Sequence, residues 1–253
     1  MGFVLAWIRG VAAAVVLLTA GVFSPRLRGY LRQFAREVGV AKPHVGPFPA
    51  KRPDFVGDPT LPLALPGLDA QDGNVSALEL AVLARLVKSR APMLLWEIGT
   101  FDGRTTRVLA ANAPAGAQVH TLDLPADGLG RTAHALSPSE RDLVKKPSSG
   151  ARFAGTPEQA KITQHLGDSA TFDFTPWRRQ ADFVFVDGSH AAAYVVSDTN
   201  RAGLLTDDRK AVVVWHDYGE WPGVTETLDT LAPTLKGAYR VAGTTLVVWE
   251  RNV

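Results

Sequence analysis

The stretch MLLWEIGTFDGRTT, residues 93–106, decides the fold of this chain. It opens with a short apolar run, Met93 to Ile98, which stops at Gly99 and is typical of a strand buried on both faces of a sheet. A second glycine, Gly103, follows in the same turn, and residues 104–112 then have the pattern of a helix. Strand, glycine turn and helix in this order predict an α/β unit in which the amino terminus of the helix faces the turn.

The same alternation fills the chain on both sides of this stretch. Before it, a helix begins after a cap at Asn74 or Ser76 and ends before Pro92. After it, we predict strands at residues 118–122, 162–166, 181–186 and 211–215, helices at 194–205 and 224–231, and a hairpin of 239–241 with 245–249. The expected fold class is α/β: a Rossmann-like, mostly parallel sheet of seven strands with helices on both faces, a C-terminal antiparallel hairpin and a preceding N-terminal apolar helix.

Acidic or imidazole side chains stand at the ends of the predicted strands. In an open α/β sheet, ligands bind at the carboxyl ends of the strands, where these side chains meet. A single acid at such a position is equally well explained as a helix cap. Five strand ends of this kind are better explained by a binding site, formed by Glu97, Gly99, Asp123, Asp168, Asp187, His216 and Asp217.

The glycine turn indicates which kind of ligand fits. Its sequence is not GxGxxG, which disfavours a dinucleotide pyrophosphate and therefore an oxidoreductase. Glu97 supplies an anion and the backbone N–H groups after Gly99 supply donors, so the turn suits a ligand with both an ammonium and a carboxylate group. Asp123, at the end of the next strand, can accept hydrogen bonds from both hydroxyls of a ribose.

The order of these motifs resembles that of class I S-adenosylmethionine-dependent methyltransferases, over roughly Ser76 to Glu250. The runs FVFVDGSH (183–190), VWHDY (214–218) and WPGV (221–224) are similar to a small-molecule O-methyltransferase subgroup that includes antibiotic sugar O-methyltransferases and cephalosporin-hydroxylase-like proteins. Asp168 is placed beside adenine by the resemblance, and it is also a good cap for the helical turn that follows. The resemblance implies S-adenosylmethionine as cofactor, bound by Glu97, Gly99, Thr100, Phe101, Gly103, Thr105, Asp123, Leu124, Asp168, Ser169 and Asp187.

Methyl transfer needs an aligned acceptor and a base, because the sulfonium methyl group is already activated. We expect His190 to be the base, since imidazole titrates near neutral pH, with His216 as the second choice and Asp187 as a further catalytic group. Some relatives hold a divalent ion on the acids after these two strands. Asp187, Asp217 and His216, with His190 as a further ligand, form the matching set for Mg²⁺. Metal-using families often have two acidic or amide groups where this chain has His-Asp, so the sequence leaves open whether the site binds a metal ion.

The connection over residues 125–156, called the insertion below, is long for a link between two strands. Its basic and histidine side chains are Arg131, His134, Arg141, Lys145, Lys146 and Arg152. Long connections often cover binding sites, so we predict that the insertion covers the acceptor and that its basic content favours an acidic or phosphorylated one. A disordered, solvated insertion is the alternative.

The amino-terminal part of the chain differs from the rest in composition. Eight of the 27 Lys and Arg residues, but one of the 25 Asp and Glu residues, lie within residues 1–52. Arg9 separates two apolar runs, 3–8 and 11–23, and four arginines follow them: Arg26, Arg28, Arg32 and Arg36. Three interpretations stay open: a membrane anchor with a cytoplasmic catalytic domain, a cleaved signal peptide, and a helix that packs on the domain or on a second subunit.

These patterns divide the chain into an apolar helix that can anchor in a membrane (1–24), a basic helix with a Pro/Gly-rich linker (25–73) and an S-adenosylmethionine-binding domain (74–253). The chain has no cysteine, which excludes disulfides and thiolate metal sites. The residues after 52 are mildly acidic and form no basic patch of the kind that binds nucleic acid. The basic residues within 1–52 suit an anionic membrane surface. We expect methyl transfer to a hydroxyl oxygen of a small-molecule acceptor. A non-catalytic ligand-binding or membrane-tethered module on the same fold is the alternative, and a homo-oligomer is left open.

Overall fold

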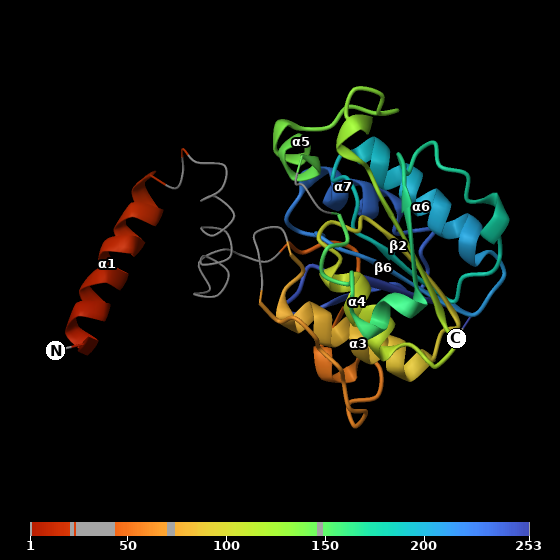
Figure 1. The fold of residues 1–253 in the computed structure, drawn as a ribbon, viewed down its shortest axis with the longest axis horizontal. Coiled ribbons are helices and arrows are strands. Elements are labelled where there is room, and N and C mark those ends of the chain that lie inside the picture. Colours follow the sequence, from red (N-terminus) through yellow and green to blue (C-terminus); the bar gives the residue numbers. More distant parts are fainter. Residues whose placement is uncertain (1, 21–22, 24–43, 70–73, 146–148, 253) are drawn as a thin grey trace. The chain divides into compact units, whose positions relative to one another are not determined.

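The computed structural model of the chain describes all residues except 1, 21–22, 24–43, 70–73, 146–148 and 253 (Figure 1). The chain divides into two compact units, Met1–Val45 and Gly46–Val253. The first unit contains helix α1 (Gly2–Ala20), and the basic helix expected after it lies outside the described residues. Within the described part of the chain, no helix is both long and apolar enough to cross a membrane. Helix α1 exposes large apolar side chains, namely Val4, Leu5, Trp7, Ile8, Val11, Val15, Val16 and Leu18.

The second unit is built around one sheet of eight strands in the order β1-β7-β8-β6-β5-β2-β3-β4. Neighbouring strands are parallel except where β8 pairs with β6 and with β7. The mostly parallel sheet with an antiparallel hairpin at its C-terminal end is therefore confirmed. The strands are β1 (Ala50–Lys51), β2 (Leu94–Ile98), β3 (Gln118–Asp123), β4 (Ile162–Leu166), β5 (Phe183–Val186), β6 (Ala211–Trp215), β7 (Tyr239–Val241) and β8 (Val247–Arg251).

The predicted count of seven strands is wrong because strand β1 lies in the proline-rich stretch that we interpreted as a linker. It pairs in parallel with β7 at the edge of the sheet, through Ala50 opposite Arg240 and Lys51 opposite Val241. Proline is tolerated next to such a strand, since an edge strand bonds on one side alone. Pro49, which has no N–H group, contributes its carbonyl oxygen, 3.0 Å from the Arg240 nitrogen.

Helices cover both faces of the sheet, as predicted (Figure 1). Helices α3 (Ala77–Arg90) and α4 (Arg104–Asn112) lie on one face, and α6 (Ala192–Thr206) and α7 (Pro222–Leu231) lie on the other. Ser76, one of the two predicted caps, begins α3 in a capping box with Glu79. The connections contain α5 (Pro138–Val144) and the short 3-10 helices η2 (Pro53–Phe55), η3 (Ala126–Gly128), η4 (Pro157–Lys161) and η5 (Thr175–Trp177).

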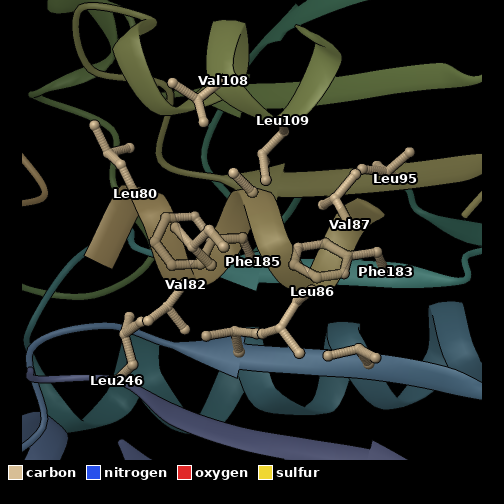
Figure 2. Packing of buried hydrophobic residues seen from close by; sticks show 14 of the residues in the cluster. Leu80, Val82, Leu86, Val87, Leu95, Val108, Leu109, Phe183, Phe185 and Leu246 are labelled. Atoms are coloured by element: carbon tan, nitrogen blue, oxygen red, sulfur yellow. The ribbon is translucent and has the colours of Figure 1, made fainter. Parts of the chain in front are cut away.

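Two apolar cores fill the space between the sheet and these helices. In the first, shown in Figure 2, Leu86 of α3 and Leu109 of α4 pack with Phe183 of the central strand β5. The second core contains Trp96 and Trp215. Because successive side chains of a strand point to opposite faces, a strand buried on both faces must be apolar throughout. This burial explains the continuous apolar runs that mark β2, β5 and β6 in the sequence.

The order of strands places a binding site at the ends of β2 and β5. The chain runs outward from β2 through β3 to β4, then returns to begin β5 on the other side of β2. Such a reversal is the point at which open α/β sheets bind ligands. The residues after these two strands, Gly99 and Asp187, are in direct contact: a β-carbon on Gly99 would lie 2.0 Å from the Asp187 carbonyl oxygen.

Candidate active site

Two glycines shape the turn after β2. Gly99 and Gly103 have φ angles of 101° and 86°, a region that favours glycine. At Gly103, a β-carbon would lie 2.6 Å from the ring of Phe153, which belongs to the insertion. The turn therefore packs against the end of β5 at Gly99 and against the insertion at Gly103, so closely that a side chain at either position would clash.

Glu97 is buried at the end of β2 and leaves one carboxylate oxygen unpaired. It accepts hydrogen bonds from the hydroxyls of Thr106 and Thr121, the second at 2.6 Å. Its Oε1 atom is buried without a hydrogen-bond partner among the described residues. Burial raises the pKa of Glu97 to about 8, although the two threonine bonds act to lower it. A buried carboxyl group with one unpaired oxygen beside the glycine turn fits a cationic group of a ligand.

Asp123, the last residue of β3, already binds a hydroxyl group. Burial raises its pKa to about 6, and a hydrogen bond from the Ser149 side chain acts against this effect, as do the N–H groups of Phe101 and Leu124. The Ser149 oxygen accepts a bond from Gln164 at 2.7 Å, so its own proton is available to Asp123. A ribose would offer the same kind of donor at this position.

Asp168, after β4, is engaged with the protein on both carboxylate oxygens. Oδ1 accepts the N–H of Ala170 at 2.9 Å, which confirms that Asp168 caps the following turn. Oδ2 accepts bonds from the Ala133 nitrogen at 2.6 Å and from the Tyr194 hydroxyl at 2.9 Å. Ala133 belongs to the insertion, so Asp168 also anchors that segment, while the contact of Asp168 and Ser169 with adenine stays a prediction.

The side chains after β5 and β6 form a set of close acid–imidazole pairs. His190 Nε2 lies 2.7 Å from Asp217 Oδ2, and His216 Nδ1 lies 2.9 Å from Asp187 Oδ1 and 3.3 Å from Asp217 Oδ2. All four side chains are less than one-fifth exposed. We call these four residues, together with Glu79 and Glu140, the acid–histidine cluster.

The two glutamates reach the cluster from helices that the strand-end pattern does not include. Glu79 Oε2 of α3 lies 3.4 Å from His216 Nε2, and Glu140 Oε1 of α5 lies 3.5 Å from His190 Nδ1. Both are the last residue of an S-x-x-E sequence, at residues 76–79 and 137–140. That sequence signals a helix start and gives no sign of a binding site.

The charges of the cluster determine its protonation. Burial acts to lower the pKa of His190, but the charge of Asp217, the hydrogen bond to Asp217 and the nearby Glu140 carboxylate raise it to about 10. The pKa of His216 is also raised, by Asp187, Asp217 and Glu79 against burial. Burial raises the pKa of Asp187, whereas the two histidines hold that of Asp217 below its usual range despite burial. The carboxylates of the cluster therefore favour the positively charged form of both imidazoles.

Trp221, just before α7, fixes the plane of the His190 ring. The two rings are stacked with centroids 4.3 Å apart and an interplanar angle of 9°. A β-carbon on Gly223 would lie 2.2 Å from the carbonyl oxygen of His190, so glycine allows the start of α7 to approach the site.

A small cavity lies beside the cluster. Its volume is about 10 Å³, enough for one water molecule. It is lined by Val186, Asp187, Gly188, Ser189, His190, Val195, Trp215, His216, Asp217 and Val224.

The insertion contacts both halves of the site, as expected of a segment that covers it. Two backbone N–H groups of the insertion, those of Gly150 and Arg152, donate to the carbonyl oxygens of Phe101 and Asp102 in the glycine turn, at 3.0 and 2.9 Å. Its Glu140 accepts bonds from the loop after β5. The described part of the insertion thus spans the predicted cofactor and acceptor sides.

One group in the cluster has the spacing of metal ligands. Among the described residues, Asp187, His190 and Asp217 each offer one ligand atom, and these atoms lie within 4.8 Å of one another. His216, which we predicted as a ligand, lies between Glu79 and Asp187 with a carboxylate at each ring nitrogen. His216 Nδ1 nevertheless lies 2.9 and 3.3 Å from the carboxylate oxygens of Asp187 and Asp217, so His216 stays a predicted ligand beside His190.

Comparison with protein families gives a match over the centre of the chain. Residues 96–218 match the model of a family described as a methyltransferase domain. The matched segment runs from β2 to just after β6 and contains the glycine turn, Asp123 and the four strand-end residues of the acid–histidine cluster. A comparison with curated protein sequences finds no match.

Solved structures give further likenesses at low identity. An O-methyltransferase from Streptomyces achromogenes, TomG, involved in tomaymycin synthesis and bound to SAM, is 21% identical with a TM-score of 0.48, over 72% of this chain and 83% of that one. The SAH-bound methyltransferase PaMTH1 of Podospora anserina is 14% identical with a TM-score of 0.49, over 70% and 79%. An O-methyltransferase from Bacillus cereus with SAH is 15% identical with a TM-score of 0.45, over 74% and 84%. The ligands and activities in these names are those of the named proteins.

Proposed function

We propose that the chain, whose residues 96–218 match a family described as a methyltransferase domain, transfers the methyl group of S-adenosylmethionine to a hydroxyl oxygen of a small molecule. One observation carries the proposal. The unpaired Glu97 oxygen and the hydroxyl-binding Asp123 lie at adjacent strand ends, and the acid–histidine cluster lies at the next two strand ends. A cofactor half and a reaction half therefore meet at the switch point of the sheet.

The residues around the glycine turn fit the parts of S-adenosylmethionine. The unpaired Glu97 oxygen suits the ammonium group, and the amino end of α4 suits the carboxylate. Asp123 would exchange its bond with Ser149 for the ribose hydroxyls. When bound, the cofactor supplies a methyl group already activated by its sulfonium charge. The chain has to position the acceptor and remove its proton.

His190, paired with Asp217, is the group that we assign to the acceptor proton. As the acceptor oxygen forms its bond to the methyl carbon, the carbon–sulfur bond breaks and leaves its electron pair on sulfur. The hydroxyl proton goes to the His190 imidazole, which Asp217 stabilises in its charged form at 2.7 Å. Because the carboxylates of the cluster favour the charged form of His190, the pair has to release a proton before each transfer.

The same side chains also fit a divalent cation. Asp187, Asp217 and His190 would hold it, and it would lower the pKa of an acceptor hydroxyl. An imidazole nitrogen bound to a cation cannot accept a proton, so the two roles of His190 exclude each other. We favour the proton acceptor, because Asp217 already pairs with His190 and needs no cation to balance its charge.

The first unit adds a second part to the proposal. Trp7 is 63% exposed and lies in α1 among other exposed apolar side chains, while Arg9 is its single charge. We propose that this helix contacts a membrane surface, which an apolar helix followed by basic residues would bind. The full chain should float with anionic vesicles, and a chain that begins at Gly46 should not. Equal flotation of the two chains would contradict this part.

Calorimetric titration of the full chain tests the cofactor directly. S-adenosylmethionine and S-adenosylhomocysteine should bind with a Kd of roughly micromolar order, and NAD should not bind. Incubation with methyl-labelled cofactor and a panel of small hydroxylated acceptors should then give a labelled ether. Failure of both sulfur ligands to bind would contradict the proposal, and binding without transfer to any acceptor would favour a non-catalytic module.

A further inference from the structure

Glu140 joins the insertion to the acceptor side of the site through a single carboxylate. Its Oε2 atom accepts the N–H of Ser137 at 2.7 Å and so closes the start of α5. Its Oε1 atom accepts the Ser189 hydroxyl and the N–H of His190, both at 2.7 Å. With this residue only 5% exposed, none of these bonds competes strongly with water.

The same oxygen lies beside the imidazole of His190. Oε1 is 3.5 Å from Nδ1, while Asp217 lies at Nε2 and Trp221 covers one face of the ring. Nδ1 itself is buried and has no hydrogen-bond partner among the described residues. Three side chains therefore surround the ring, those of Asp217, Trp221 and Glu140, and of these Glu140 belongs to the insertion.

We propose that Glu140 is a positioning residue for methyl transfer, which holds the His190 ring from the insertion through its contacts with Ser189 and His190. This inference rests on the proposed function. Glu140 touches neither cofactor nor reacting atoms in this arrangement; it acts through the backbone and ring of His190. Its hydrogen bond from the His190 backbone N–H fixes the segment that carries the ring, and its carboxylate beside Nδ1 favours one orientation of the ring.

A simpler explanation is that Glu140 only caps α5. The two roles use different oxygens, so they can be separated. Ser137→Ala removes the hydroxyl that accepts the Glu140 N–H at 3.3 Å and that also bonds to the Glu140 carboxylate, and it leaves the Ser189 and His190 partners of Oε1 unchanged. If capping is the whole role of Glu140, Ser137→Ala and Glu140→Ala should lower the rate of transfer alike.

The experiment compares four full-length variants: Glu140→Ala, Glu140→Gln, Ser137→Ala and Asp142→Asn. Asp142 is the matched control, because it lies on the same helix with its side chain 77% exposed and pairs with Lys145 alone among the described residues. For each variant, kcat and KM for the acceptor, the Kd for S-adenosylmethionine and the hydrogen exchange of residues 129–145 are measured.

Glu140→Ala should lower kcat by about 10- to 100-fold, keep the cofactor Kd within about twofold of wild type, and speed exchange in residues 129–145. Glu140→Gln keeps an oxygen that can accept the Ser189 and His190 bonds, so it should recover part of kcat. Ser137→Ala and Asp142→Asn should keep wild-type kcat. A wild-type kcat in Glu140→Ala, or an equal loss in Ser137→Ala, would overturn the inference.

Hydrogen exchange separates this inference from the proposed function. Faster exchange in Glu140→Ala tests the bond between insertion and site in any protein with this structure, whether or not it transfers a methyl group. If the wild-type chain binds no S-adenosylmethionine, the proposed function fails while the exchange result still stands. If the wild type is active and exchange in residues 129–145 is unchanged by Glu140→Ala, the inference fails alone.

Discussion

Glu79 and Glu140 hold the same position in two capping boxes, and each faces one histidine of the acid–histidine cluster. The Glu79 carboxylate accepts a hydrogen bond from the Ser76 N–H group and lies 3.4 Å from a ring nitrogen of His216. The Glu140 carboxylate accepts one from the Ser137 N–H group and lies 3.5 Å from a ring nitrogen of His190. Residues that begin two helices therefore also set the electrostatics of the site. The position of α3 and of the insertion is in this way linked to the two imidazoles.

Asp123→Ala should weaken binding of S-adenosylmethionine by at least about tenfold, because a hydrogen bond to a charged group contributes about 1.5–3 kcal/mol. The Kd is measured by calorimetric titration at constant salt. Asp127→Ala, an exposed acid in η3 a few residues further on, is the control and should bind like wild type. Equal affinity in both variants would remove Asp123 from the cofactor site.

His190→Asn should leave the cofactor Kd unchanged and lower kcat by about 100-fold, the usual contribution of a positioned base. Asparagine retains a polar group near Asp217 but cannot take up a proton. Single-turnover transfer with saturating cofactor measures the chemical step. A variant with wild-type turnover would show that another group accepts the proton, and His216 would be the next to replace.

Gly99→Ala should destabilise the domain more than Gly116→Ala. Both glycines have positive φ, 101° and 81°, so both substitutions cost about 1–2 kcal/mol in backbone strain. At Gly116 no atom lies within 4 Å of the new β-carbon, whereas at Gly99 it would lie 2.0 Å from a carbonyl oxygen. Urea unfolding of the two variants measures the difference. Similar losses would mean that the contact between β2 and β5 relaxes without cost.

Sequence patterns predict the parts of the site that belong to local structure. Strand β2 and helix α4 follow from an apolar run, a glycine turn and a helical period, all within one short stretch. Parallel strands bring their carboxyl ends to one edge, so the place of Asp123, Asp187 and Asp217 on the same edge of the sheet also follows from the strand order.

Contacts between distant elements could not be predicted in the same way. The Glu140 side chain meets His190, which lies 50 residues away along the chain, and Glu79 meets His216 across 137 residues. Strand β1 has two residues, which are too few to give a periodic pattern in the sequence, and its partner β7 lies far along the chain. Which ring nitrogen faces which acid depends on the packing of α5 and α7, and no local pattern encodes that packing.

A strong chelator should leave the rate of transfer within about twofold of its value without chelator. His190 pairs with Asp217 at 2.7 Å and can accept the acceptor's proton only when no cation occupies its ring nitrogen, so the proposed mechanism needs no metal. Activity is assayed after dialysis against chelator, with Mg²⁺ and Mn²⁺ added back separately. Loss of activity that either ion restores would assign Asp187, His190 and Asp217 to a metal and exclude His190 as the base.

His120 should make the stability of the domain depend on pH below neutrality. It is buried in β3, lies 3.0 Å from a His165 nitrogen and stacks on Trp96. Burial first, and His165 second, lower its pKa to about 4, from 6.5 in the unfolded chain. Between these two values the unfolded chain binds one proton more than the folded chain. The contribution of His120 to the free energy of unfolding should therefore fall as pH decreases through this window, by up to about 1.4 kcal/mol per pH unit.

His120→Phe retains an aromatic ring in the stack but has no proton to bind, so it isolates this contribution. Urea unfolding of wild type and variant from pH 7.5 down to about 4.5 measures the two slopes. The wild type should lose stability more steeply than His120→Phe. Parallel curves for wild type and His120→Phe would show that His120 binds its proton equally well in the folded and unfolded chain.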